Sequence, residues 1–252
     1  MFFDVLTIFP EMFDSFRENG MIRLAIERDL ILCNSINIRD FASGKHRVTD
    51  DRPYGGGCGM VMKPAPLAGA IRYSVAKCTN PEKIRTVLLT PQGRPFSQQI
   101  ADEFSQLDGL VLVCGRYEGV DERVCDKLVD DEISIGDYVM TGGELAAMVI
   151  IDSVARLIPG VLGGEESACM DSFQNGLLEH AHYTRPDVFE NRGVPDVLLS
   201  GNHAEIEKWR FETSLKRTFL KRPDLLVNRE LSNREKNILK NWCCQLERII
   251  ES

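Results

Sequence analysis

Two apolar runs that stop at glycine and lead into helix-like segments constrain the fold of this chain more than any other feature. One reads LVLVCGRYEGVDERV from residue 110, and the other reads EISIGDYVMTGG over residues 132–143. Each run has the length of a buried strand, and the glycines allow the backbone to turn or to approach a ligand closely. If both strands belong to one parallel sheet, their turns build a single pocket for a nucleotide-like ligand at its carboxyl edge.

The rest of the N-terminal part alternates between strand and helix patterns. Apolar runs predict strands over 2–9, 30–41, 85–93, 108–115 and 133–136, and 3.6-residue periodicity predicts helices over 12–29, 64–78, 97–107, 119–130 and 143–158. Residues 42–60 are polar and glycine-rich, which is typical of a functional or disordered loop. Strands that alternate with helices predict an α/β fold with a mainly parallel sheet.

Strand patterns disappear after a glycine-rich segment, GVLGGEESACM, at residues 160–170. Small and acidic residues with three glycines are typical of a linker or mobile loop. Helical patterns follow, one capped by Ser200 or Asn202 and ended by Pro223. We therefore expect an α/β domain over 1–160, a flexible linker over 161–172 and a helical domain over 173–252.

Composition and charge narrow the class of protein. The chain has 252 residues with 43% hydrophobic and 27% charged side chains, which is ordinary for a globular protein. No apolar run is long enough for a membrane helix, and the start of the chain lacks a basic signal region, so we expect a cytoplasmic protein with no membrane contact. The eight cysteines form no CxxC pair and the four histidines show no metal spacing, so we expect no zinc site.

The two halves differ in charge. Residues 1–170 carry 25 acidic and 17 basic side chains, whereas residues 171–252 carry 13 of each. Overall acidity argues against a nonspecific nucleic-acid coat but leaves room for a local RNA-binding patch. The basic side chains between 208 and 222 fit either such a patch or an ordinary solvated helix face.

An ordered set of motifs places the chain in a family. It runs through RDF, KHR, DDRPYGGG, TPQGR, VCGRYEG, SIGDYV, TGGE, DSF, HYTRP, KWR and RPDLL, and covers at least residues 1–226. In this set the chain closely resembles the bacterial tRNA (guanine-N1)-methyltransferases of the SPOUT class. The resemblance implies a parallel-sheet SPOUT domain with a C-terminal trefoil knot, followed by a small all-helical domain. It also implies an obligate homodimer that methylates N1 of the guanosine 3′-adjacent to the anticodon (position 37), which supports reading-frame maintenance.

The resemblance also assigns a site for the methyl donor, S-adenosyl-L-methionine. Backbone groups there would read the adenine edge while apolar side chains cover the ring, although core packing and ordinary turns explain the residue types about as well. The positions that match the family's cofactor site are Leu88, Leu89, Thr90, Pro91, Gly115, Tyr117, Glu118, Ile135, Gly136, Asp137, Tyr138, Val139, Met140, Gly142 and Gly143.

Two residues match the family's catalytic positions. Guanine N1 carries a proton at neutral pH, so attack on a methyl sulfonium needs a base at N1 and positive charge near O6. The resemblance implies Asp171 as the base and Arg156 as the O6 partner. Taken alone, Asp171 would be a helix cap and Arg156 a surface or ion-pair residue. The position of Asp171 beyond a mobile loop predicts that the site assembles only when tRNA orders the loop.

Further positions match contacts to Mg²⁺ and to the anticodon arm of tRNA. Glu118 is one possible Mg²⁺ contact, but the sequence shows no dedicated cage. Lysine and arginine would position the tRNA through its phosphates. The expected tRNA-binding residues are Lys45, His46, Arg47, Asp50, Arg52, His182, Arg185, Lys208, Arg210, Lys216 and Arg217.

Two other functions remain as alternatives. A nucleotide-dependent dehydrogenase or NTPase would need a GxGxxG or GxxxxGK[ST] motif after the first strand, and FFDVLTIFPEMF contains neither. A noncatalytic RNA-binding module of the same fold would more readily have lost Asp171 or Arg156. The chain departs from the family pattern at Cys58, Ile133, Ala146 and Ala181, and none of these replaces a proposed catalytic group.

Overall fold

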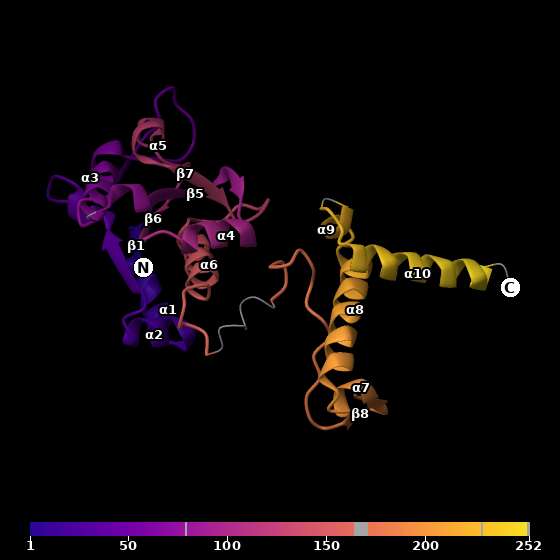
Figure 1. Ribbon diagram of the computed structural model, residues 1–252. Helices are drawn as coiled ribbons and strands as arrows, with labels where there is room; N and C mark the ends of the chain where they lie inside the picture. The colour runs from indigo at the N-terminus through magenta and orange to yellow at the C-terminus, as the bar shows by residue number, and fades with distance from the viewer. Residues whose placement is uncertain (79, 164–170, 228, 251–252) are drawn as a thin grey trace. The chain divides into compact units, whose positions relative to one another are not determined.

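The structure, a computed structural model, describes residues 1–78, 80–163, 171–227 and 229–250. The chain divides into two compact units, unit 1 (Met1–Glu165) and unit 2 (Glu166–Ser252), which are described separately (Figure 1). Val161, which the sequence places in the linker, is buried in the core of unit 1. Residues 164–170 of the expected linker lie outside the described part of the chain.

A five-stranded sheet forms the centre of unit 1, in the order β2-β1-β6-β5-β7. Every neighbouring pair is parallel, as the alternation of strands and helices predicts. The carboxyl ends of all five strands therefore meet at one edge. The strands are β1 (Phe2–Thr7), β2 (Leu32–Asn37), β5 (Ile84–Pro95), β6 (Gly109–Cys114) and β7 (Asp131–Ser134).

Helices cover both faces of the sheet. The two faces are separated by the strand alternation: Leu110 and Leu112 of β6 join one apolar cluster, and Val111 and Val113 join the other. Because β6 is buried along its whole length, it must be covered on both sides. The first face is covered by α2 (Gly20–Glu27), α4 (Gln98–Ser105) and α6 (Glu144–Ala155), and the second by α3 (Pro64–Val75) and α5 (Glu122–Leu128) (Figure 1).

The single helix expected over residues 12–29 is instead broken into three pieces. A 3-10 turn, η1 (Pro10–Phe13), leads into α1 (Asp14–Glu18), and α2 begins separately at Gly20. Asn19 between them is extended, with φ −130° and ψ 158°, and Gly20 has φ +64°. Glycine accepts this left-handed geometry without a steric penalty, so the break falls at the position where the helical pattern contained glycine.

Strand β5 (Ile84–Pro95) extends beyond the strand that the sequence predicts over 85–93, and its pairing is interrupted at residues 90–93. Both Leu89 and Arg94 lie opposite Ile133 of β7, so residues 90–93 leave the ladder and the strand then resumes its pairing. Phe96 closes the segment with a 2.7 Å hydrogen bond from its N–H to the carbonyl of Ser134. A β-bulge of this kind is common beside functional sites, where it redirects backbone out of the sheet.

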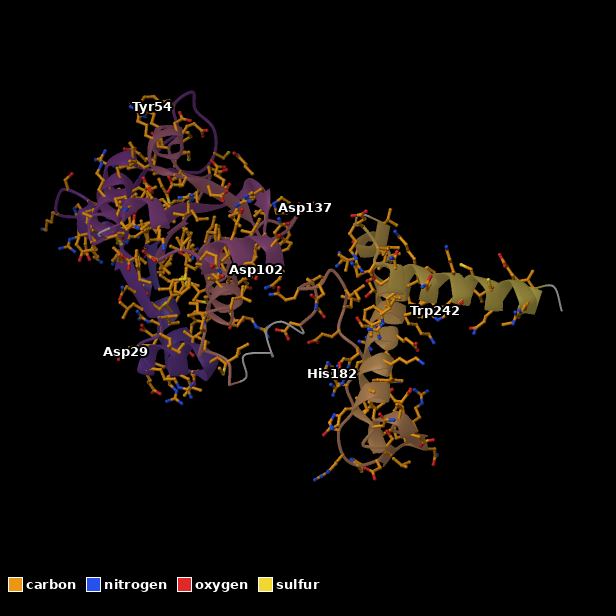
Figure 2. All side chains as sticks on the ribbon, viewed as in Figure 1. Asp29, Tyr54, Asp102, Asp137, His182 and Trp242 are labelled. Carbon is orange, nitrogen blue, oxygen red and sulfur yellow. The ribbon has the colours of Figure 1, made fainter. Side chains whose placement is uncertain are left out.

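The loop over residues 42–60 is largely irregular, as expected, but it is tied down at both ends. It follows the 3-10 turn η2 (Ile38–Phe41), and its β3 (Asp50–Asp51) pairs with β4 (Val61–Met62). A third 3-10 turn, η3 (Pro81–Lys83), leads into β5. Tyr54 at the tip of the loop is 98% exposed (Figure 2).

Unit 2 is mainly helical, and the expectation that it is all-helical is wrong. A two-stranded antiparallel hairpin, β8 (Val188–Phe189) with β9 (Arg192–Gly193), precedes the long helix α8 (His203–Lys221). Such two-residue strands leave almost no periodicity in a sequence. The other helices described in this unit are α7 (Asp196–Leu199), α9 (Asp224–Val227) and α10 (Asn233–Ile250). Of the two expected caps for α8, Asn202 is the one used, since its side chain accepts a hydrogen bond from the N–H of Glu205.

Candidate functional site

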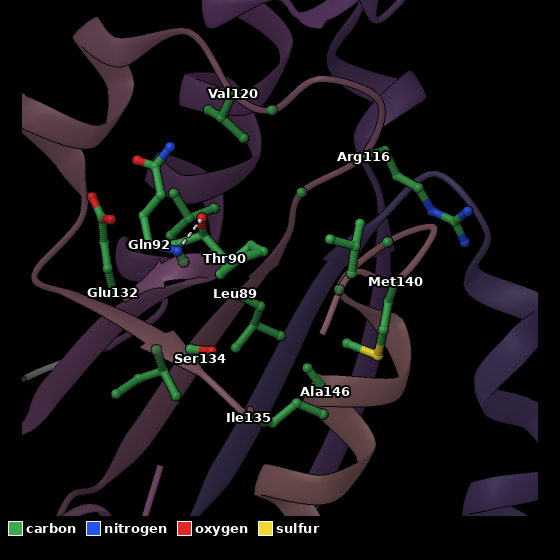
Figure 3. Close-up of a pocket in the computed structure, with 18 of the residues that line it drawn as sticks. Leu89, Thr90, Gln92, Arg116, Val120, Glu132, Ser134, Ile135, Met140 and Ala146 are labelled. Carbon is green, nitrogen blue, oxygen red and sulfur yellow. Dashed lines mark hydrogen bonds between the residues drawn. The ribbon is translucent and has the colours of Figure 1, made fainter. Parts of the chain in front are cut away.

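A cavity of about 400 Å³ opens at the carboxyl ends of β5, β6 and β7 (Figure 3). Its walls are the bulge after Leu89, the loop that starts at Gly115, and the loop that leads from β7 into α6. The volume lies in the range of pockets that hold small-molecule ligands. The position is the one that parallel α/β sheets use for nucleotide-like ligands.

The structure brings together the residues that the sequence assigns to the cofactor. Every one of them lines the cavity except Asp137, which is exposed at the surface of unit 1 (Figure 2). The lining also includes residues that the sequence analysis did not assign, although most lie inside the same motifs: Gln92, Arg116, Gly119, Val120, Glu122, Cys125, Glu132, Ile133, Ser134, Thr141 and Ala146. Two of these, Ile133 and Ala146, are positions where the chain departs from the family pattern.

The two glycine-rich loops form a close-packed wall. The N–H of Gly143 donates to the carbonyl of Gly115 at 3.0 Å, and Arg116 and Gly142 form an antiparallel bridge. A Cβ on Gly143 would come within 2.9 Å of the Cα of Cys114 and 3.1 Å of the Cβ of Leu89. Any larger residue at Gly143 would therefore push the loops apart, so glycine is needed here for close approach and not only for a turn.

The segment after β7 is shaped by its own hydrogen bonds. Ser134 Oγ donates to the carbonyl of Gly136 at 3.2 Å, and Tyr138 Oη donates to the carbonyl of Ile135, also at 3.2 Å. Gly136 has φ +148°, a region that side chains other than glycine rarely adopt. The segment leaves Tyr138 half exposed and Val139 90% exposed at the cavity. Apolar side chains left in water beside a cavity are suited to covering the flat face of a ligand.

Carboxylates dominate the charged part of the lining. Glu118, Glu122 and Glu132 are acidic, whereas Arg116 forms an ion pair with Glu144, with its Nη2 2.9 Å from Oε2. Burial, together with the nearby charges of Glu122 and Glu132, raises the pKa of the Cys125 thiol to about 11. Cys125 is therefore a neutral thiol at neutral pH and not a nucleophile.

The two expected catalytic residues lie in different units. Arg156 follows α6 directly and lines a second cavity of about 170 Å³ with Asp152 and Val161. Asp171 lies in unit 2 and caps no helix. Its carbonyl instead accepts from the N–H of Gln174 at 3.3 Å in a turn.

The expected tRNA-binding residues also fall in both units. In unit 1, Lys45, His46, Arg47 and Arg52 are exposed on the irregular loop, whereas Asp50 is half-buried in β3. Arg47 Nη1 lies 2.7 Å from Asp40 Oδ1.

In unit 2, His182 is exposed with its Nε2 3.5 Å from Glu179 Oε2 (Figure 2). Arg185, Lys208 and Lys216 are exposed, whereas Arg210 and Arg217 are half-buried. Arg210 forms an ion pair with Glu207 at 2.6 Å.

The described residues contain neither a metal-binding cluster nor a membrane-spanning helix. Within them, no group of three or more His, Cys, Asp or Glu side chains is arranged to hold a metal ion. None of the helices in that part of the chain has the length and apolarity needed to cross a bilayer.

The sheet and its cavity define a class of protein: a parallel α/β fold that holds a nucleotide-like ligand in backbone loops at its carboxyl edge. Comparison with known proteins narrows the class. The family model described as tRNA (Guanine-1)-methyltransferase TrmD matches residues 1–228. The chain belongs to this family of enzymes.

Similar proteins that carry the same name match nearly the full chain. A protein of Desulfatibacillum aliphaticivorans named tRNA (guanine-N(1)-)-methyltransferase is 52% identical over 252 residues, which is 100% of this chain and 95% of the relative. Proteins with the same name from Geobacter sp. (strain M21) and Listeria monocytogenes (strain EGD-e) are 56% and 51% identical. They cover 94% and 95% of this chain and 94% and 97% of their own lengths.

Proposed function

We propose that the protein transfers a methyl group from S-adenosyl-L-methionine to N1 of the guanosine 3′-adjacent to the tRNA anticodon, position 37, and thereby supports reading-frame maintenance in the cytoplasm. The observation that carries the proposal is the convergence of three motif loops on one cavity in a chain of this family. A noncatalytic RNA-binding module would have no need of such a cavity.

The lining fits S-adenosyl-L-methionine, which would supply a methyl group on a positively charged sulfonium. Backbone groups of the segment over 135–140 would meet the adenine edge, and Leu88, Val139 and Met140 would cover the ring. Glu118 and the other carboxylates give the cavity a negative lining that suits a cationic donor. The described residues build no Mg²⁺ cage around Glu118, and we assign no step to Mg²⁺.

Asp171 and Arg156 would carry out the chemistry on guanine. The Asp171 carboxylate would accept the N1 proton, which frees the N1 lone pair to form the bond to the methyl carbon; the bond from that carbon to sulfur would break, and S-adenosylhomocysteine would leave as a neutral thioether. The Arg156 guanidinium would donate to O6, where negative charge develops as the proton leaves. Arg156 precedes the expected linker and Asp171 lies at its end, so tRNA binding would bring them into place by induced fit.

The length of α6 supports a homodimer with composite active sites. The helix begins at the cavity, after Gly143, and Arg156 follows its other end. Its 12 residues span roughly 18 Å, at about 1.5 Å per residue. One guanine cannot reach the donor and Arg156 of the same chain across that distance. We therefore propose that a second copy supplies Arg156 to each cavity.

We propose the trefoil knot for the same region. The chain leaves β7 at the edge of the sheet, and Gly142 and Gly143 then lie against Arg116 and Gly115 after β6. The return across β5 to β6 supports a knotted path through the loops that line the cavity. In this arrangement unit 1 binds the donor, and unit 2 uses the basic residues of α8 to bind the anticodon arm.

Methyl transfer to a set of tRNA transcripts tests the function. The transcripts carry G, A, C or U at position 37, and the product is mapped by primer extension. Only the G37 transcript is expected to gain a methyl group at N1. Asp171→Asn should lower the single-turnover rate by about 10² to 10⁴ while S-adenosylhomocysteine still binds. A rate within tenfold of wild type would remove Asp171 from the mechanism, and no product on any transcript would refute the proposed function.

Mixed dimers test whether the sites are composite. One chain carries Arg156→Ala and the other Gly143→Val, which pushes apart the loops that form the cavity wall. If Arg156 acts on the partner's cavity, purified heterodimers contain one intact site and keep about half of the activity. If both elements act within one chain, each site of the heterodimer is defective and activity is lost. Homodimers of each variant provide the inactive controls.

A further inference from the structure

We infer that Arg116, Glu144 and Thr7 form a positioning unit that holds two walls of the cofactor cavity at a fixed separation and so sets the affinity for the cofactor. The inference rests on the proposed function, because it concerns the cavity assigned above to S-adenosyl-L-methionine. None of the three residues is among the expected cofactor contacts.

Glu144 is the centre of this unit. It is the first residue of α6 and only 1% exposed. Its Oε1 accepts from Thr7 Oγ1 at 2.8 Å and from Arg116 Nε at 3.1 Å. Arg116 Nη2 lies at an ion-pair distance of 2.9 Å from its Oε2, although only Oε1 accepts a hydrogen bond from the guanidinium. A buried carboxylate needs such a partner, and arginine supplies it in a fixed geometry.

Arg116 joins loops that are distant in the sequence. It lies directly after Gly115 at the end of β6, and its Nη1 donates to the carbonyl of Thr141 at 3.2 Å in the loop after β7. Its Cζ lies 4.6 Å from the ring centroid of Phe9, after β1. One side chain thus contacts both glycine-rich walls of the cavity and the end of a third strand.

The fit around Arg116 leaves no room for the walls to shift independently. A Cβ on Gly142 would overlap the Nε of Arg116, so backbone and guanidinium are in direct contact. Figure 3 shows Arg116 reaching away from Leu89 and Thr90. Its charged end is therefore directed to Glu144 and the loop backbone, and we assign it a positioning role and not a contact with the cofactor.

Three substitutions separate this role from simple stabilisation. Arg116→Lys keeps the positive charge but loses the forked geometry that joins Glu144 to Thr141. Thr7→Val removes, at nearly constant volume, the hydrogen bond to Glu144 and the 3.0 Å bond that the N–H of Phe9 donates to Thr7 Oγ1. Thr7→Ser keeps the hydroxyl that makes both. Arg123→Lys is the matched control, because Arg123 follows the same loop but is exposed and forms an ion pair with Asp121 at 2.7 Å.

The assay is calorimetric titration with S-adenosylhomocysteine, together with thermal unfolding and steady-state kinetics. Arg116→Lys should raise Kd by about tenfold or more, the equivalent of one lost contact, and raise KM for the methyl donor by more than it lowers kcat. Thr7→Val should raise Kd by a smaller factor, whereas Thr7→Ser and Arg123→Lys should match wild type.

Two results would overturn the inference. One is a folded Arg116→Lys protein with the wild-type Kd. The other is a lower binding stoichiometry with an unchanged Kd, which indicates only a loss of folded protein. Failure of the wild-type protein to bind S-adenosylhomocysteine would refute the proposed cofactor and not the positioning role, so the two failures are distinguishable.

Discussion

Gly93→Ala is expected to damage both the sheet and the cavity, because Gly93 is where the bulge of β5 passes closest to β7. A Cβ at this position would overlap the carbonyl carbon and oxygen of Glu132 and the nitrogen of Ile133. These are backbone atoms of a paired strand, so they cannot rotate away as a side chain would. The two strands must separate locally, which breaks the pairing that resumes at Arg94.

The loss in the free energy of unfolding can be estimated from the backbone hydrogen bonds that the substitution would break. Separation of β5 from β7 would break the 2.7 Å hydrogen bond from the Phe96 N–H to the Ser134 carbonyl and the ladder hydrogen bonds beside Arg94 and Pro95. Two to three backbone hydrogen bonds at about 0.5 to 1.5 kcal/mol each give a loss of about 1 to 4 kcal/mol in the free energy of unfolding. At about 2 to 4 °C per kcal/mol for a protein of this size, the unfolding midpoint should fall by several degrees or more.

The assay is a thermal melt combined with titration of S-adenosylhomocysteine. Because Thr90, Pro91 and Gln92 line the cavity, the same displacement should weaken cofactor binding about tenfold for each contact worth about 1.4 kcal/mol. Gly163→Ala is the control, since no atom lies within 4 Å of a Cβ built there. A Gly93→Ala protein with the same midpoint and Kd as Gly163→Ala would refute the steric argument.

Two further predictions concern ionisable groups. Burial alone would raise the pKa of Glu235, but hydrogen bonds from Arg229 and Ser232 outweigh it and lower that pKa below 4.5. The stability from its charged form is therefore present above pH 4.5 and is lost as pH falls through the folded pKa. Glu235→Gln should cost about 1.5 to 3 kcal/mol in urea unfolding at pH 7 and progressively less as the pH falls below 4.5 and through the folded pKa, and a pH-independent difference would contradict the charge argument. For the thiols, iodoacetamide at pH 8 should modify exposed Cys58 quickly and Cys125 slowly, because the raised pKa of about 11 leaves about one thiolate in a thousand at Cys125. Peptide mass spectrometry measures both rates, and equal rates would show that Cys125 is not shielded.

The sequence predicts the sheet well because its central strands, β1 and β6, are buried on both faces. The continuous apolar run LVLVC over 110–114 has the length of a buried strand and stops at Gly115. Such runs identify the cavity, since loops after neighbouring parallel strands must meet. Periodicity does not predict the break at Asn19, because a glycine within a helical pattern is often tolerated.

Other features depend on contacts between distant segments. The resumption of β5 at Arg94 depends on Ile133 pairing twice, and no local pattern in TPQGR encodes that. Arg116 and Glu144 are 28 residues apart, and their ion pair exists only because the loops after β6 and β7 converge. The hairpin of unit 2 is held by two residues per strand, too few for alternation to be visible.

The turn that carries Asp171 changes how the proposed base should be understood. The sequence places Asp171 at the end of a linker, yet the residues after it are attached to unit 2. Leu177 is buried with Leu215 of α8, and the N–H of Leu178 donates to Thr218 Oγ1 at 2.9 Å. The N–H of Glu179 donates to Ser172 Oγ at 3.0 Å, which closes the turn on itself.

The base is thus attached to the helix whose exposed basic residues, Lys208 and Lys216, are proposed to bind tRNA. We expect Asp171 to move together with α8. The hydrogen bond from Leu178 N–H to Thr218 Oγ1 attaches the segment to α8, and the bond from Glu179 N–H to Ser172 Oγ attaches the residue next to Asp171 to that segment. If Asp171 is the base and α8 binds tRNA, as proposed, binding of the anticodon arm and placement of the base would be one event and not two. This coupling would let tRNA binding itself control when proton abstraction occurs.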